Sequence, residues 1–310
     1  MNKIESKIHA RNPLLVVLWS LGLFILMQAP QYVGTFVASI ISGISFGSIM
    51  KSGITDAYPI LGRGITIAII GIPLALIVTK YLWRRPKSWI RLEFKPGYLL
   101  GGLLGGIILP IIAVLLISLF ANVSLEFNPR QLSHPELAAM ILGIFAYMLF
   151  IGTAEELVFR GMTIREWAYK WGWGISIIIG GIYFGVLHLV SILPELTVVK
   201  AIWIILAAVS VTTLFTALYI RSKSLWLPIG FHAGWNFCLD GILGATISGH
   251  GSGTALCKTD ISGAGIFTGG TFGMESSLLT ICVYLIAAYL VIRLFRKKSN
   301  GLLSSKEYIV

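Results

Sequence analysis

The sequence predicts an all-α membrane protein, a polytopic bundle of about eight transmembrane helices with both termini in the cytoplasm. Of the 310 residues, 56% are hydrophobic and only 12% are charged, about half of the charged share of an average soluble domain. Long apolar runs also recur along the chain, and each approaches the roughly 20 residues that a helix needs to cross the hydrocarbon core. A chain of this composition is expected to place its apolar surface in lipid.

The predicted spans differ in how polar they are. The first contains Pro30, where we expect a kink or break. The span 226–243 is the most polar, and its polar side chains must turn toward protein rather than lipid. In order, the spans are 14–41, 63–83, 98–121, 136–154, 174–193, 198–220, 226–243 and 277–295.

The N-terminus shares one feature with signal peptides, because Lys3, Lys7 and Arg11 precede an apolar run. A signal peptide has an apolar region of about 7–15 residues followed by small residues at the cleavage site. Here the run continues past Met27 without such a site. We therefore expect an uncleaved first span.

The net charge of +11 could indicate a nucleic-acid partner, but its distribution favours a membrane topology. With the N-terminus inside, most Lys and Arg residues fall on one side of the membrane, and such an excess marks the cytoplasmic side. We expect contact with anionic lipid head groups and no nucleic-acid partner. The basic segments are 3–11, 80–95, 160–170, 221–223 and 293–306.

We expect one integral domain with four parts. Residues 1–134 hold three N-terminal transmembrane helices, 135–245 form the core, 246–276 form an outward loop, and 277–310 hold the last helix and a basic tail. The loop is rich in Gly, Ser and Thr, which predicts irregular structure. The three cysteines, Cys238, Cys257 and Cys282, match neither a disulfide framework nor a zinc pattern.

Charged side chains follow directly after the fourth predicted span, 136–154. Residues four apart share one face of a helix, so Glu156 and Arg160 can pair and leave Glu155 free as a candidate base. The alternative is that these charges merely meet water at the cytoplasmic end of the helix.

Two further polar groups repeat the four-residue spacing. Phe184 and His188 share one helix face, as do His232 and Asn236. Each group could be structural, since an interhelical hydrogen bond contributes roughly 0.6–2 kcal/mol. A charge at membrane depth, however, costs about 2.5 kcal/mol or more. Together the groups provide a base, two imidazoles and an amide, which can activate water and stabilise an oxyanion.

These motifs resemble, in order, those of the CPBP family of intramembrane proteases, which includes CAAX prenyl endopeptidases and bacterial Abi proteins linked to bacteriocin processing and self-immunity. The resemblance covers residues 135–245. It implies that Glu155 is the general base, that His188 helps to hold the attacking water, and that His232 and Asn236 stabilise the oxyanion. It also implies a supporting role for Glu156 and Arg160 and substrate binding by Phe184. The motifs are Glu155-Glu156-x3-Arg160, Phe184-x3-His188 and His232-x3-Asn236.

The cofactor requirement stays open, because the family is described both as metalloproteases and as glutamate-dependent proteases without metal. Glu155, His188 and His232 could supply three zinc ligands and an open position. No HExxH motif occurs in the sequence, and such a motif would mark a zinc protease. We favour activation of water by glutamate and histidine with no cofactor, and we keep zinc as the alternative.

We therefore expect a multi-pass endopeptidase of a bacterial plasma membrane that hydrolyses a peptide or a membrane-anchored protein near the cytoplasmic face. A non-catalytic self-immunity or regulatory protein of the same fold is one alternative, and a transporter or channel that relays protons is another. Helix counting raises one difficulty. It places Glu155 at the inner end of its span and His188 roughly 21 Å along the next, so a boundary must move for them to meet.

Overall fold

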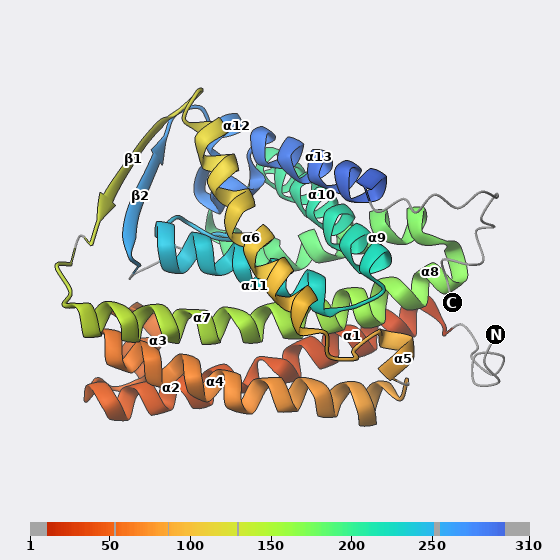
Figure 1. Ribbon diagram of the computed structural model, residues 1–310, viewed down its shortest axis with the longest axis horizontal. Helices are drawn as coiled ribbons and strands as arrows, with labels where there is room; N and C mark the ends of the chain where they lie inside the picture. Colours follow the sequence, from red (N-terminus) through yellow and green to blue (C-terminus); the bar gives the residue numbers. More distant parts are fainter. Residues whose placement is uncertain (1–10, 53, 86, 129, 251–254, 295–310) are drawn as a thin grey trace.

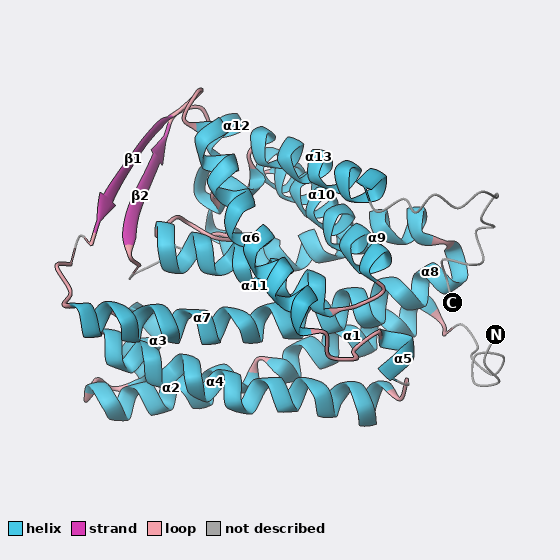
Figure 2. Ribbon diagram, viewed as in Figure 1, coloured by secondary structure: helices cyan, strands magenta, loops and turns pink. Residues whose placement is uncertain are grey.

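The computed structural model describes residues 11–294 except 53, 86, 129 and 251–254. Within these residues, six helices are long and apolar enough to cross a membrane, which confirms the predicted helical bundle. Figure 2 shows helices throughout, with one pair of strands at the edge of the molecule. The six helical runs are Pro13–Ser42, Ala57–Trp83, Pro96–Ile117, His134–Trp171, Trp173–Glu195 and Val198–Ser222.

The other two predicted spans form shorter helices. The span 226–243 becomes α11 (Trp226–Phe237), followed by a π-helical turn, Cys238–Leu243. Most of α11 is buried, because it packs between α6 (Pro96–Ile117) and α7 (His134–Glu156). The last span becomes α13 (Leu278–Leu294). The sequence therefore predicted these helices, although within the described residues neither reaches the length expected of a separate span.

The first predicted span is broken near Pro30, as expected. Helix α1 (Pro13–Met27) ends before Gln28, and α2 (Ala29–Ser42) carries Pro30 in its first turn. Proline fits this position because the first turn of a helix needs no donor from its backbone nitrogen.

Helix α7 lies in the middle of the molecule (Figure 1). It packs against α4 (Ala57–Ile77) on one side and α11 on the other. The contact with α4 is very close, since a Cβ atom added at Gly64 would lie 1.8 Å from the carbonyl oxygen of Gly143. Small residues permit such close packing of membrane helices. Short helix α3 (Phe46–Ser52) connects α2 toward α4.

The predicted end of the fourth span, at residue 154, is wrong. Helix α7 continues through a π-helical turn, Leu157–Ile164, into α8 (Arg165–Trp171). Glu155 therefore lies near the middle of a continuous helical run, His134–Trp171, and the helix does not end beside it. This removes the difficulty raised by helix counting. The alternative that these charges meet water at a helix end is therefore wrong, and π-helical turns of this kind are frequent at functional sites.

The next two helices flank this central run. Helix α9 (Trp173–His188) ends at His188 and passes into the 3₁₀ turns of Leu189–Glu195. Helix α10 (Val198–Ser222) packs against α9 and α13. Helix α9 thus brings Phe184 and His188, the second motif, to the same side of α7 as α11.

The predicted outer segment 246–276 has more regular structure than its composition indicated. Strand β2 (Cys257–Ser262) pairs antiparallel with β1 (Asn122–Phe127), and a short helix, α12 (Gly265–Thr268), follows. The expectation of an irregular loop was therefore wrong over these residues. The two strands are far apart in the chain. The Gly-rich composition of one segment therefore gives no sign that it pairs with the other.

Basic and aromatic side chains gather at the opposite end of the molecule from the strands. There Glu166 of α8 pairs with Arg85 at 2.6 Å and with Arg11 at 3.8 Å, next to short helix α5 (Lys87–Ile90). The start of α1 and the end of α13 lie on this same side in Figure 1. This agrees with the clustering of basic segments on one side. The terminal residues 1–10 and 295–310 lie outside the described residues.

Candidate active site

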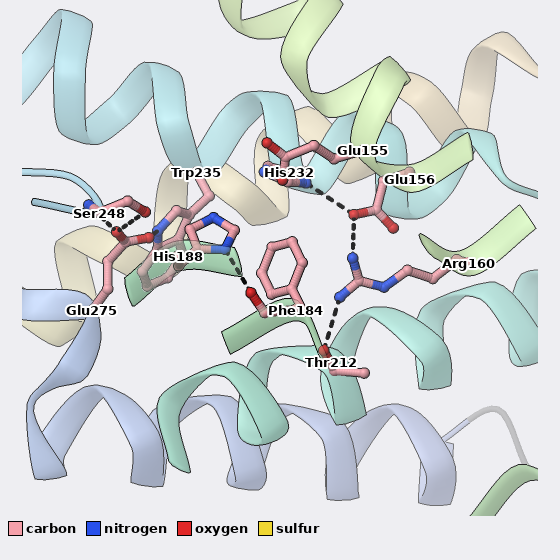
Figure 3. Close-up of polar contacts among 10 residues, drawn as sticks. All are labelled: Glu155, Glu156, Arg160, Phe184, His188, Thr212, His232, Trp235, Ser248 and Glu275. Carbon is pink, nitrogen blue, oxygen red and sulfur yellow. Dashed lines mark hydrogen bonds and ion pairs between the residues drawn. The ribbon is translucent and has the colours of Figure 1, made fainter. Parts of the chain in front are cut away.

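Glu156 is the centre of a polar cluster between α7 and α11 (Figure 3). Its Oε1 accepts hydrogen bonds from Nη1 of Arg160 at 2.8 Å and from Nδ1 of His232 at 2.9 Å. The side chains of Glu156 and Arg160 are completely buried. The predicted pairing of these two residues is therefore confirmed, and it does not take place at a solvated helix end.

Arg160 is enclosed by aromatic rings. Its guanidinium carbon lies 5.3 Å from the ring centre of Phe184 and 4.9 Å from that of Phe215. Its Nη2 makes a long contact of 3.4 Å with the hydroxyl of Thr212. A buried charge is stable only when it is well paired, and ring faces add a cation–π contribution. Arg160 was also expected among the basic residues of a cytoplasmic loop, and that part of the prediction is wrong.

His232 lies between the two adjacent carboxylates of α7. Because its Nδ1 contacts Glu156, its Nε2 faces Glu155, with 3.8 Å between Nε2 and Oε2 of Glu155. That distance is too long for a direct hydrogen bond, so a water molecule beside the two atoms can contact both. The side chain of Glu155 is 13% exposed whereas that of Glu156 is fully buried. Of the two carboxylates, Glu155 is thus the one that can meet water.

His188 is held by its own helix. Its Nδ1 lies 2.8 Å from the carbonyl oxygen of Phe184, and the two rings are in contact at 4.2 Å between centres. The ring of Phe184 lies between His188 and Arg160 (Figure 3). Among the described residues, no hydrogen bond or ion pair joins His188 to Glu155 or His232. The structure therefore brings Glu155 together with one of the two predicted imidazoles.

Phe184 and Asn236 differ in what surrounds them. Phe184 is buried against Phe159 and His188, so it forms a wall of the cluster. Asn236 follows His232 by one helical turn on α11 and is half-buried. Its side chain makes no hydrogen bond to any other described residue, which leaves its amide available to a bound group.

The residues expected as zinc ligands do not form a three-ligand group as they lie. Among the described residues, no three His, Cys, Asp or Glu side chains are arranged to hold a metal ion. Glu155 and His232 face each other, but Nδ1 of His188 is directed at a backbone carbonyl. A tetrahedral zinc site needs its protein ligands close to 2 Å from one point. The positions of Glu155, His188 and His232 in this structure therefore do not fit a tetrahedral zinc site.

The sequence analysis missed residues on other elements that contact the cluster or hold α11 in place. Thr212 and Phe215 of α10 contact Arg160 and His232. Glu275 accepts hydrogen bonds from Nε1 of Trp235 at 3.0 Å and from the backbone of Ser248 at 2.8 Å, which ties the outer segment to α11. A hydroxyl inside the apolar span 198–220 was an available signal for Thr212. No local pattern marked Glu275.

A comparison with known families gives a match over the part of the chain that carries the three motifs. Residues 137–238 match the family model described as type II CAAX prenyl endopeptidase Rce1-like. All the motif residues fall inside this range, so the match confirms the resemblance that the motifs predicted. It supports an intramembrane CAAX-type protease fold, and the six apolar helices agree with an integral, multi-pass membrane protein. A comparison with curated proteins gave no match.

Proposed function

We propose that this chain, whose residues 137–238 match a CAAX prenyl endopeptidase family model, is an intramembrane endopeptidase in which Glu155 and His232 activate a water molecule. The observation that carries the proposal is the continuous series Arg160, Glu156, His232 and Glu155, in which each side chain faces the next. A buried ion pair alone would not require a second carboxylate beside the imidazole. The partly exposed Glu155 supplies one.

The arrangement defines the proton positions on His232. When Glu156 accepts a hydrogen bond from Nδ1, the neutral ring carries its proton there, and the lone pair of Nε2 is directed toward Glu155. A second partner commonly sets the tautomer of a functional histidine in this way. A water molecule between the two groups can then donate one proton to Glu155 and the other to Nε2. Arg160 pairs with Glu156 through a direct contact of 2.8 Å.

The reaction follows from these positions. Glu155 accepts a proton as the water oxygen attacks the carbonyl carbon of the scissile peptide bond, which forms a tetrahedral oxyanion. The amide of Asn236 donates a hydrogen bond to that oxyanion. The carbon–nitrogen bond then breaks, and Glu155 returns its proton to the departing amine. One peptide and one water thus give one carboxylic acid and one amine.

The substrate is a peptide or a protein anchored in the same membrane, since Glu155, Glu156 and Phe184 lie on helices that are long and apolar enough to cross it. A host with a bacterial plasma membrane would provide peptide precursors of this kind. Hydrolysis near the cytoplasmic face agrees with the basic end of the bundle beside α8.

The proposal can be tested with the full chain in proteoliposomes. A library of membrane-anchored peptides is added, and cleavage is followed by mass spectrometry. Glu155→Gln should lower cleavage by about 10²–10⁴-fold, the usual contribution of a general base, without loss of thermal stability. Glu126→Gln removes an exposed carboxylate on β1 and should leave cleavage unchanged. Full activity of Glu155→Gln would remove Glu155 from the mechanism.

A non-catalytic role, such as self-immunity or regulation, is the second candidate. One observation favours it, because among the described residues no hydrogen bond or ion pair joins His188 to Glu155 or His232. In that case, cells that produce Glu155→Gln or His232→Gln would keep the protective phenotype of the wild type. Loss of protection together with loss of cleavage supports the protease.

A further inference from the structure

A groove of about 630 Å³ opens between α8, α9, α10 and α13. Its walls are mainly apolar and aromatic, and two basic side chains, Lys170 and Arg221, lie among them. We call it the basic groove, defined by Tyr169, Lys170, Trp173, Ile220, Arg221 and Ile292.

The basic groove is separate from the candidate active site. Thr212 contacts Arg160 in the site, whereas the next residue, Thr213, lines the groove. Consecutive residues on a helix point about 100° apart. The groove therefore lies against a different face of α10, and the proposed hydrolysis makes no use of it.

Positive charge is concentrated behind one wall of the groove. Trp173, which lines it, contacts the ring of Tyr219 with 6.2 Å between centres. Arg165 donates to the hydroxyl of Tyr219 at 3.0 Å, and the guanidinium of Arg91 lies 5.2 Å from the same ring.

These two arginines have no carboxylate within ion-pair distance among the residues that the structure describes. Both are buried, and each has a side-chain nitrogen without a hydrogen-bond partner. The neighbouring acid, Glu166, is held by Arg85 and Arg11. Burial lowers the pKa of Arg91 to about 10, so Arg91 still carries its charge at neutral pH. The region behind the groove therefore favours an anion.

The location of the groove indicates which anion is available. It lies at α8, at the end of the bundle where the basic segments gather, which the Lys and Arg distribution assigns to the cytoplasm. Tyr169 and Trp173 are residues typical of the boundary between lipid and water. Anionic phospholipids populate the cytoplasmic leaflet at this depth.

We propose that the basic groove binds an anionic phospholipid of the cytoplasmic leaflet. Its phosphate group lies at Lys170 and Arg221, which donate charge-assisted hydrogen bonds. One acyl chain lies along the apolar wall formed by Ile177, Ile220 and Ile292. Apolar and cationic surfaces side by side match a lipid better than a free phosphate, which would leave the apolar wall uncovered.

The test uses the full-length protein in nanodiscs that contain phosphatidylcholine and phosphatidylglycerol in equal amounts. Native mass spectrometry then counts the lipids that stay bound. We expect selective retention of phosphatidylglycerol, and a loss of about fivefold in its affinity for each charge removed by Lys170→Gln or Arg221→Gln. Ile292→Trp, at a partly exposed position at the end of α13, should displace the acyl chain while it keeps both charges.

The matched controls are the single variants Lys80→Gln and Lys95→Gln, each of which removes one charge at the same end of the bundle but outside the groove. Both controls should retain phosphatidylglycerol as the wild type does. An equal loss in either control, equal retention of both lipids by the wild type, or binding of free inorganic phosphate in place of the lipid would each overturn the proposal. The experiment measures lipid retention and not cleavage. A negative result would therefore overturn the lipid proposal and leave the proposed protease activity untouched.

Discussion

Nδ1 of His232 donates a hydrogen bond of 2.9 Å to Oε1 of Glu156, across the contact between α7 and α11. The same oxygen also accepts from Arg160. One carboxylate therefore both compensates a buried cation and orients the imidazole beside Glu155. This division of roles between adjacent carboxylates predicts different consequences when each is changed.

Glu156→Gln should destabilise the protein, whereas Glu155→Gln should not. Removal of one partner leaves Arg160 buried without compensation, and such a change costs about 3–5 kcal/mol. Thermal unfolding of both variants in the same detergent measures the difference. The double variant Glu156→Leu/Arg160→Met, which removes both charges, should recover part of the lost stability. Equal melting temperatures for Glu155→Gln and Glu156→Gln would contradict this assignment.

The two histidines should also differ. His232 faces Glu155 whereas His188 contacts Phe184. His232→Gln should therefore reduce kcat by about 10²-fold or more, and His188→Gln should reduce it less. Kinetics on one cleaved peptide would compare the two. If both variants lost activity equally, His188 would have to reach the water when substrate is bound.

Local spacing predicted part of this site, and tertiary packing supplied the rest. The contact between Glu156 and Arg160 follows from their separation by four residues, because each turn of one helix brings such residues together. The contact between Glu156 and His232 joins residues 76 positions apart. No spacing rule specifies which rotation of α11 brings them into contact.

The errors in the fold have the same origin. The fourth span was ended at residue 154 because charged residues usually mark the membrane surface, but here Glu156 and Arg160 neutralise each other inside the bundle. The ladder between β1 and β2 joins two segments that precede and follow residues 135–245 in the chain. Apolar periodicity reports which residues need burial, and it does not report which distant segment covers them.

Asn236→Ala should lower kcat by about 10²–10³-fold with little change in KM, as expected for the loss of a donor to the oxyanion. Its amide has no partner among the described residues, so removing it should not break a structural hydrogen bond. Steady-state kinetics and a melting curve on the same preparation separate the two effects. A lower melting temperature with unchanged kcat would identify Asn236 as structural.

Chelation should leave cleavage unchanged. The proposed proton transfers run between water, Glu155 and His232, which face each other in the structure, and they use protein groups alone. The measurement is elemental analysis of active protein, paired with cleavage before and after dialysis against a chelator. Stoichiometric zinc, and recovery of activity on adding zinc back, would establish the alternative in which Glu155, His188 and His232 move together as ligands.

Gly64→Ala should destabilise the protein, because α4 and α7 have no room for a methyl group at their crossing. The added Cβ would lie 1.8 Å from a backbone oxygen and 2.8 Å from the Cα of Gly143, so the two helices would have to separate. Gly22→Ala is the matched control, since nothing lies within 4 Å of a Cβ added there in α1. Alanine favours helix by up to about 1 kcal/mol over glycine, so the control should be neutral or slightly more stable. Melting temperatures of the two variants measured side by side check this expectation, and a stable Gly64→Ala would show that the close contact between α4 and α7 is not required.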